Sequence, residues 1–515
     1  MFRNEYNGCK TFGCENLGNP DLNLYTPSSR LGYPAYYCPK CGAYPPKLLN
    51  RPIITLANYI DQQRRNAITS LSLQCRCQGQ LPGDNPVQRQ WRPHDKTRIG
   101  TQRLRCSQCH TVASLANPKK QARSLQPLLD LLLSGCPANE LQIRSALNKK
   151  LFYQRLRTLT QLLEAVSYSY EQCWLAQQHT VSLHTHSHVV RCRSGLSASN
   201  NTKVKSAKLK QRGLDCWFLT TADSATGYLL LISDNLLPQS SMDIRKAHQC
   251  HHPDESGEYT LDSIEQAVPP SKDVLHTAKL TYQKIMSRQQ FDKLAYCTRE
   301  FAKSNEGTLL RPVYAAHSHF QNLKQHLPSN IDLNLVLEHE SFIRGAAITA
   351  FAEQVKLDQA NLYYLHAFPC HEPSFASSEV TSNKQTLSWW HEKWYQFSHH
   401  NQCEHWQLGL GVLTHTGQLE ISTKNNAVPT RPDWHNQFWC HFDNWLPASY
   451  RSKISHAQLM QWIGIFRYLY NFSGRYLAIP QFQNHESFSE SNGWGSVEYL
   501  VDTVNKFVIS GPDNQ

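Results

Sequence analysis

The chain has 515 residues, of which 40% are hydrophobic and 10% aromatic, a composition that excludes a globally disordered protein. Its formal net charge of +12 is unevenly distributed. Residues 1–213 hold 30 Lys and Arg against 10 Asp and Glu, giving +20, whereas the remainder holds 22 against 30, giving −8. A basic half joined to a mildly acidic half predicts a polyanion-binding end and a separately built body.

The sequence contains no apolar run of about 18 residues, and its N-terminus, MFRNEYNGCKTFGCEN, lacks the apolar stretch of a signal peptide. We therefore expect a cytoplasmic protein with no membrane partner. In a reducing compartment, 17 cysteines are not expected to form a disulfide framework. Eight of the cysteines fall in short pairs within the basic region, which favours metal binding.

The four short cysteine pairs predict two structural zinc ions. Their spacings are C-x4-C, C-x2-C, C-x-C and C-x2-C, and two such pairs on facing turns supply the four thiolates of a tetrahedral zinc site. Gly42, directly after the second pair, suits a turn that needs a positive φ. The expected quartets are Cys9, Cys14, Cys38 and Cys41 in a zinc ribbon over 1–50, and Cys75, Cys77, Cys106 and Cys109 in a second zinc ribbon over 51–122. Pairing across the quartets, use of His110, and unpaired core cysteines are the alternatives.

Basic residues surround the second quartet and continue into a predicted all-α helix-turn-helix over 123–175. Leucines at helical spacing predict a helix over 123–134, Gly135 ends it, and a second helix begins at Pro137. A basic third helix over 149–165 is the one expected to enter a major groove. The residues expected to bind DNA here are Arg98, Arg103, Arg105, Lys119, Lys120, Arg123, Lys149, Lys150, Tyr153, Arg155 and Arg157. The alternative for these residues is an ordinary solvated face.

Alternation of side chains predicts three strands in the middle of the chain, over 181–191, over 214–223 and in YLLLISDN from residue 228. His184, His186 and His188 share one face of the first strand. Metal binding by these three histidines, or by Cys250, His251 and His252, is an alternative to packed or surface histidines. The loop between the first two strands is expected to contact DNA phosphates through Lys203, Lys205, Lys208, Lys210 and Arg212.

The α/β pattern resumes with a predicted strand over 332–339, a helix over 341–356, a strand over 361–368 and a late helix over 453–472. A three-strand meander followed by such units is typical of an α/β RNase-H-like core. We expect this core over 176–480, with insertions at about 240–305 and 367–450 and a C-terminal helical region. Residues 481–515 are expected to form a peripheral tail.

These elements, in this order, resemble bacterial insertion-sequence transposases of the DDE class with N-terminal zinc ribbons. The stretches that carry the likeness are LRCSQC, LLLSGCPANELQIRSAL, LHTHSHVV, TTADSATGYLLLISD, LVLEHESFIRGA and FRYLYNF. The resemblance implies a nucleoid-associated DNA-recombination protein whose partner is double-stranded DNA. Transposases of this class cut and join DNA with two Mg²⁺ ions held by three carboxylates.

The resemblance also places three catalytic positions, and this chain departs from the pattern at two of them. The positions fall at His186, Glu338 and His456. Imidazole suits Zn²⁺ or Cu²⁺ better than Mg²⁺. We therefore predict a degenerate triad, a DNA-binding protein without strand transfer, and a body that serves a homodimer or docks another protein.

Two other functions are compatible with the sequence. An active transposase or nuclease would use Mg²⁺ and displaced carboxylates, with Asp223, Glu338 and one of Glu404, Glu420 or Asp443 as candidates. A zinc-ribbon module that binds RNA or protein would offer Tyr36, Tyr37 and Trp91 for base stacking.

Overall fold

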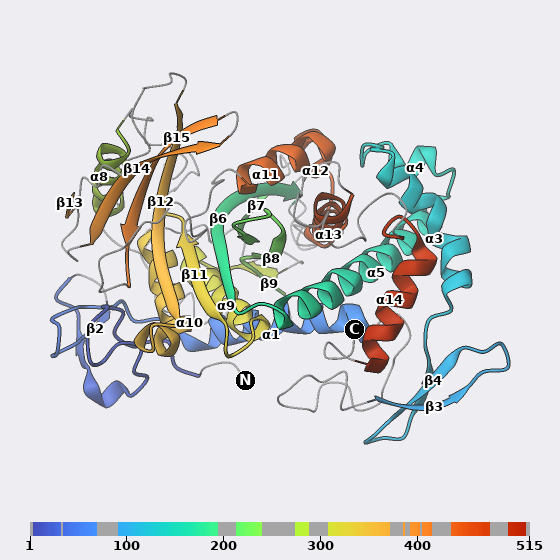
Figure 1. Ribbon diagram of the computed structural model, residues 1–515, viewed down its shortest axis with the longest axis horizontal. Coiled ribbons are helices and arrows are strands. Elements are labelled where there is room, and N and C mark those ends of the chain that lie inside the picture. Colours follow the sequence, from blue (N-terminus) through green and yellow to red (C-terminus); the bar gives the residue numbers. More distant parts are fainter. Residues whose placement is uncertain are drawn as a thin grey trace, which may run out of the picture.

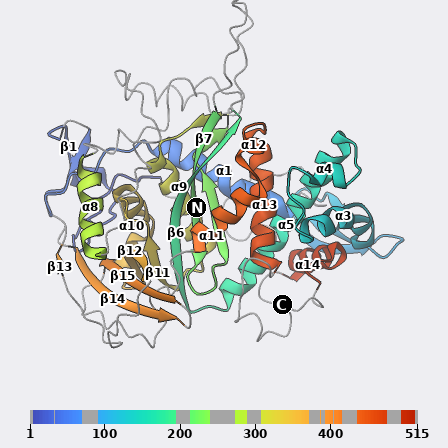
Figure 2. The ribbon, with the colours of Figure 1, turned by 90° about the horizontal axis from the view of Figure 1, so that it is seen from above.

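An eight-stranded mixed sheet with helices on both faces forms the centre of the protein (Figures 1 and 2). The computed structural model describes residues 4–31, 34–69, 91–193, 213–238, 273–287, 307–370, 385–386, 392–401, 404–414, 434–473 and 493–510. Among the helices in these ranges, none combines the length and apolar character needed to traverse a lipid bilayer.

The sheet has the strand order β13-β14-β15-β12-β11-β6-β7-β8. Its central strands β11 and β12 run parallel to β6, whereas the two flanks are antiparallel meanders. The strands are β6 (Thr180–Arg193), β7 (Gly213–Asp223), β8 (Leu229–Asp234), β11 (Asp332–Leu337), β12 (Ala360–Cys370), β13 (Gln385–Thr386), β14 (Lys393–Asn401) and β15 (Glu404–Val412). The predicted strands over 181–191, 214–223 and 361–368 are confirmed, and the one over 332–339 is confirmed as far as Leu337.

Each face of the sheet has its own hydrophobic core. One core joins β6 and β7 to α5 (Lys149–Ala176), α11 (Trp434–Trp445) and α13 (His456–Phe472). The other joins the opposite face to α1 (Asn50–Thr69), α9 (Pro312–His326) and α10 (Ser341–Lys356). Helix α8 (Val274–Ser287) packs beside β12, β14 and β15. Short elements complete the body: β9 (Leu236–Pro238) pairs with β10 (Gly307–Leu309), and α12 (Ala448–Arg451) precedes α13.

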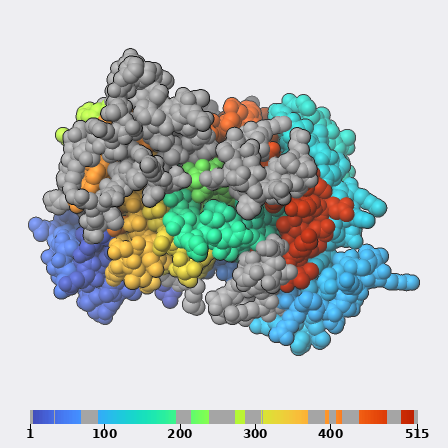
Figure 3. All heavy atoms as spheres, viewed as in Figure 1, coloured from blue at the N-terminus to red at the C-terminus, as the bar shows by residue number. Residues whose placement is uncertain are grey.

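The two cysteine-containing regions lie at opposite ends of the molecule (Figures 1 and 3). The first contains the short helix η1 (Leu22–Leu24) and the antiparallel pair β1 (Thr26–Ser28) and β2 (Ala35–Tyr37). The second is a three-stranded antiparallel sheet of β3 (Trp91–Lys96), β4 (Gln102–Cys106) and β5 (Val112–Ser114). Helices α3 (Pro118–Leu133), α4 (Leu141–Arg144) and α5 follow, with Gly135 at φ +84° between the first two.

Three parts of the chain differ from the expected organisation. Helix α1 (Asn50–Thr69) contains residues 51–69, expected in the second ribbon, and it packs on α5 and α9 because its apolar stripe completes the core there. The expected helix over 149–165 continues to Ala176 as α5. The expected tail contains α14 (Val497–Ser510), whose buried Val497, Leu500 and Phe507 pack against α3 and α5.

A buried carboxylate, Glu171 on α5, joins four helices. Its Oε2 accepts hydrogen bonds from Arg64 Nη2 of α1 and His326 Nε2 of α9, each at 3.0 Å, and its Oε1 accepts from Arg467 Nη2 of α13. Tyr228 donates its hydroxyl to the same Oε1 at 3.3 Å. Burial by itself would raise the pKa of Glu171, but Arg467, His326 and Arg64 outweigh it and hold that pKa below its usual range.

Substitution of Glu171 by Gln should therefore destabilise the protein strongly. The free energy of unfolding should fall by about 3–5 kcal/mol, because Arg64 and Arg467 would stay buried without their shared counter-ion. Urea unfolding followed by circular dichroism measures the loss. The matched control is Glu140→Gln, which removes an exposed ion pair with Arg144 and should change stability by less than about 1 kcal/mol. Equal effects of the two variants would contradict the role given to Glu171.

Candidate functional site

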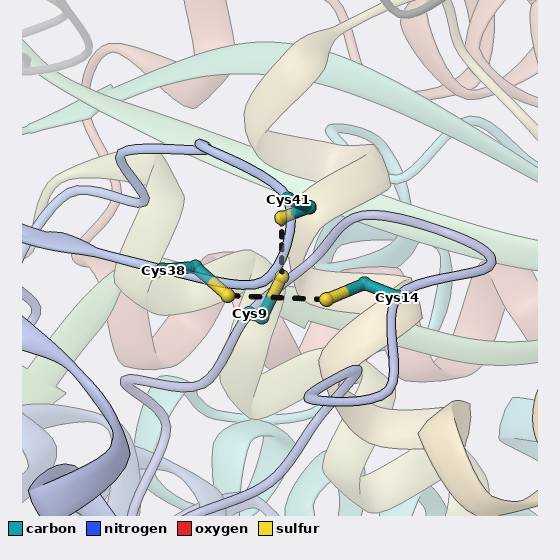
Figure 4. A group of neighbouring side chains, drawn as sticks. All are labelled: Cys9, Cys14, Cys38 and Cys41. Atoms are coloured by element: carbon teal, nitrogen blue, oxygen red, sulfur yellow. Dashed lines mark hydrogen bonds between the residues drawn. The ribbon is translucent and has the colours of Figure 1, made fainter.

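Four cysteines near the N-terminus form a cluster that could hold a metal ion (Figure 4). The sulfur atoms of Cys9, Cys14, Cys38 and Cys41 all lie within 4.8 Å of one another. The Sγ–Sγ distance is 3.5 Å from Cys9 to Cys41 and 3.8 Å from Cys14 to Cys38. Zinc bound at about 2.3 Å to four thiolates places the sulfurs about 3.8 Å apart, so the cluster matches a tetrahedral zinc site.

The local backbone explains why these cysteines converge. Gly42 has φ +73°, which confirms the expected left-handed turn after the second pair. The amide of Gly42 donates to the carbonyl of Cys38 at 2.9 Å, and the amide of Cys38 donates to the carbonyl of Ala43 at 2.9 Å. These two bonds fold the C-x2-C pair into a tight knuckle with both thiols on one side. Burial raises the pKa of Cys14 to about 11, so without a cation four neighbouring thiolates would be unfavourable.

This cysteine cluster is attached to the body of the protein. Lys10 lies between two of its ligands in sequence, and its Nζ is 3.4 Å from His317 Nε2 on α9. The ring of Tyr6 packs edge-on against His317 at 5.8 Å between centroids. A Cβ added to Gly345 of α10 would approach Lys10 Cδ to 3.2 Å, so the absence of a side chain there allows the close approach. The cluster therefore fixes a loop that rests on α9 and α10.

The second expected quartet is only partly within the described residues. Cys75 and Cys77 lie outside them. Cys106 and Cys109 lie at the turn between β4 and β5, with Cys106 buried. The amide of His110 donates to the carbonyl of Cys106 at 3.1 Å, and the amide of Cys106 donates to the carbonyl of Thr111 at 2.9 Å. The backbone of His110 has a φ of +57°. This is the hydrogen-bond pattern of the Cys38–Cys41 knuckle.

The structure brings together two of the three degenerate triad positions. His186 lies on β6, and Glu338 directly follows β11, the parallel neighbour of β6. His186 Nδ1 is 4.0 Å from Glu338 Oε2, and the same oxygen accepts a hydrogen bond from the amide of Ser187 at 2.8 Å. Both side chains are about one-third exposed, at 30% and 31%.

His456, the third position, is engaged elsewhere. It is the first residue of α13, and its Nε2 is 2.5 Å from Oδ2 of Asp234 at the end of β8. Strand β8 is separated from β6 by β7. Sequence spacing could not identify Asp234 as the partner, because 222 residues separate it from His456.

The described side chains contain no second group of three metal ligands, whether histidines, cysteines or carboxylates. His188 stacks on Trp439 of α11 at 4.6 Å, so the three β6 histidines do not converge on an ion. Asp223 accepts hydrogen bonds from the amide and hydroxyl of Thr226 and thereby closes the turn after β7. Asp443 pairs with Arg451. The side chains of Glu404, Glu420, Cys250, His251 and His252 lie outside the described residues.

Most of the expected DNA-binding side chains reach solvent. Exposed members of the set are Arg98, Arg105, Lys119, Lys120, Arg123, Lys149, Lys150 and Arg157, whereas Arg103, Tyr153 and Arg155 are half-buried. Arg103 pairs with Asp95 at 3.0 Å. Lys203, Lys205, Lys208, Lys210 and Arg212 lie outside the described residues. Trp91 on β3 and Tyr36 on β2 are buried, and Tyr37 is half-buried, so these aromatics do not form an open stacking platform.

No protein-family model matches the chain, and no curated protein matches it significantly. Among solved structures, the chain is similar to one described as "Cryo-EM structure of piggyBac transposase synaptic complex with hairpin DNA". The identity is 10%, the match covers 89% of this chain and 78% of that chain, and the TM-score is 0.27. A TM-score at this level does not establish a common fold, so the likeness carries no weight for the function of this chain.

Buried histidines should make stability depend strongly on pH. Burial lowers the pKa of His184 and His319 to about 3 and that of His326 to about 4, and it also lowers those of His188, His339 and His366. Because unfolded histidine binds a proton below about pH 6.5, the native state loses stability as pH falls from 6.5 toward 4, by up to about 1.4 kcal/mol per pH unit for each group. Burial raises the pKa of Glu164 to about 7 and that of Glu392 to about 8. These two groups oppose the histidine trend in acid, because the native state binds their protons more tightly, and their contribution to stability is lost as pH rises through 7 to 8.

We expect the melting temperature to be highest near pH 6.5–7 and to fall steeply in acid. His319, which bonds Thr221 and Ser233, is a suitable position for a variant. His319→Gln should reduce the dependence of stability on pH in acid by the contribution of about one proton. His94→Gln, at an exposed position on β3, should leave that dependence unchanged. A melting temperature independent of pH between 4.5 and 6.5 would contradict the expectation.

Proposed function

We propose that this chain is a zinc-stabilised DNA-binding protein with an RNase-H-like, transposase-derived core that lacks the carboxylate set for strand transfer. The observation that carries the proposal is the pair His186 and Glu338, 4.0 Å apart at adjacent strands. In an RNase-H-like core these two positions would each supply a metal-binding carboxylate, and here one of them is an imidazole.

The sheet topology supports the assignment of the core. Counting from β6, the strands β8, β7, β6, β11 and β12 lie in the order 3-2-1-4-5. Strands β6, β7 and β8 are antiparallel neighbours, and β11 and β12 run parallel to β6. Helix α10 connects β11 to β12. This arrangement is the one expected of an RNase-H-like fold, with β13, β14 and β15 as an addition beyond its fifth strand.

The proposed loss of strand transfer is supported by the metal ligands that the described residues offer. A two-metal site needs several hard oxygen ligands around two ions about 4 Å apart. Glu338 supplies one carboxylate, and Ser187 already donates to it. His456 is bound to Asp234, which leaves no third ligand beside Glu338 among the described side chains.

The second zinc site is supported by the repeated knuckle. Cys106 and Cys109 adopt the same two-bond turn as Cys38 and Cys41, whose thiols belong to a complete quartet. We propose that Cys75 and Cys77 complete this second site. Two closed sites of four thiolates would be structural, because neither leaves an open coordination position for chemistry.

DNA binding is supported by the placement of charge. The exposed basic side chains on β3, β4, α3 and α5 belong to the half of the sequence that carries +20. A helix-turn-helix formed by α3, α4 and α5 would direct the basic start of α5 at a major groove. Neutralising phosphates and releasing their counterions would supply the affinity.

Duplex DNA should bind with a strong salt dependence. The double variant Lys119→Ala/Lys120→Ala should weaken binding and reduce the slope of log K against log salt by up to about 2, because each phosphate contact contributes about 0.9. The charge-matched control Lys356→Ala/Lys453→Ala removes two exposed lysines of the acidic half and should leave the slope unchanged.

Gel-shift titrations measure the DNA affinity of both variants between about 50 and 200 mM salt, the range over which phosphate contacts change affinity most. Absence of DNA affinity at low salt would overturn the proposal. Stronger competition by single-stranded RNA than by duplex DNA would favour the RNA-binding alternative, and Mg²⁺-dependent cleavage of the bound duplex would favour the active transposase.

Zinc content tests the two metal sites separately. We expect about two zinc ions per chain, and about one in both Cys38→Ser and Cys106→Ser, since one missing thiolate opens a tetrahedral site. Cys440→Ser, at an exposed cysteine of α11, is the control and should keep both ions. Zinc analysis of the purified variants gives the count. A wild-type content of one ion that Cys106→Ser leaves unchanged would show that the second site does not exist.

A further inference from the structure

A cavity of about 500 Å³ lies between α1, α5, β8 and α13. Figure 1 shows these four elements close together on the side of the sheet beyond β8. The cavity is distinct from both the cysteine cluster and the His186–Glu338 pair, neither of which lines it. Its size falls within the range of about 300–1,000 Å³ that is typical of small-molecule sites.

Two arginines in this cavity share a single counter-ion. Arg64 and Arg467 both use Nη2 to reach Glu171, and Arg467 also donates to the backbone carbonyls of Leu229 and Leu230. A guanidinium has five N–H donors, so each arginine keeps further donors that bond no described residue. Asp234, the other carboxylate at this end of the cavity, is bound to His456. The two guanidinium groups thus face the one carboxylate of Glu171, and Asp234 and Glu164 are the other carboxyl groups of the lining.

Glu164 is only a partial counter-ion for these two guanidinium groups. Its Oε1 lies 2.7 Å from the position that a Cβ on Gly464 would occupy, so the carboxyl group sits directly over the bare backbone of α13. The carboxyl group makes no hydrogen bond or ion pair with a described residue. Burial raises its pKa to about 7 although Arg467 and Arg64 act to lower it, so that a substantial fraction of the group is neutral at neutral pH.

The rim and the walls indicate what the ligand would look like. Arg157, exposed on α5, lines the cavity and adds a second available cation. Much of the remaining wall is apolar or aromatic, with Tyr59, Ile60, Ala67 and Met460 among its members. A bare inorganic ion would leave most of this volume unfilled, whereas a ligand with an apolar body would bury it.

We propose that this cavity binds a small organic anion that carries one phosphate or carboxylate group on a planar or apolar body. The anionic group lies against Arg64 and Arg467, and Arg157 closes the rim. The inference does not depend on DNA binding, because none of its contacts requires a nucleic acid.

Calorimetric titration of the full chain, without DNA, tests the proposal with four probes. Phenyl phosphate or benzoate should bind saturably with one site per chain, and comparing the two shows whether phosphate or carboxylate is preferred. Benzylamine, which has the same ring and the opposite charge, should not bind. Inorganic phosphate should bind more weakly than phenyl phosphate. Failure of both aromatic anions, or binding of benzylamine or inorganic phosphate as tight as theirs, would overturn the proposal.

Three variants locate the site. Arg157→Ala should weaken binding about fivefold, as the loss of a rim charge does, whereas Arg155→Ala, on the same helix but outside the cavity, should not. Met460→Trp should abolish binding by filling the cavity, while its circular dichroism spectrum stays that of the wild type. Equal effects of Arg157→Ala and Arg155→Ala, or full binding by a folded Met460→Trp variant, would place the ligand elsewhere and refute the site.

Discussion

The arrangement of the body depends on a single buried carboxylate, Glu171. Burying one carboxylate and two guanidinium groups costs several kcal/mol for each ion unless they are paired and hydrogen-bonded. Glu171 satisfies this requirement only when α1, α9 and α13 all reach α5 in one register, since each supplies one partner. Apolar packing alone would tolerate small shifts of these helices, whereas the four-way contact does not. The network thus specifies how the helices on the two faces of the sheet meet beyond its β8 edge.

The same requirement explains why α1 belongs to the body. The segment follows a cysteine-rich region in sequence, yet Arg64 must reach Glu171, and Ile53, Leu56 and Ala57 are fully buried. The first cysteine cluster is then held against the body from two sides. Lys10 and Tyr6 contact His317 on α9, and Asn7 is hydrogen-bonded to Leu48 just before α1. Metal binding at the cluster would therefore stabilise the attachment of α1 as well as the ribbon itself.

The sequence is most informative where structure is local. Side-chain periodicity identifies β6, β7, β11, α10 and α13 to within about three residues, because each pattern spans one element. The C-x2-C knuckle is equally local, since its two hydrogen bonds join residues at most five positions apart. The Glu171 contacts and the His456–Asp234 pair join residues as much as 296 positions apart. No periodicity encodes such contacts, so the cavity that they enclose could not be predicted either.

The charge asymmetry of the sequence acquires a physical meaning from these contacts. Four carboxylates of the acidic half have structural roles among the described residues: Asp234 binds His456, Asp443 binds Arg451, Glu392 lies 3.4 Å from Arg344, and Asp223 closes a turn. A two-metal centre needs the opposite arrangement, in which several carboxylates are held close together without protein counter-ions so that metal ions neutralise them. The cations of the basic half are deployed differently. Many of the lysines and arginines of β3, β4, α3 and α5 remain exposed, and the ion pair that they make within the described residues is that of Arg103 with Asp95. Exposed cations that are not neutralised by neighbouring acids remain available to a polyanion, and this is the physical basis of the proposed DNA binding.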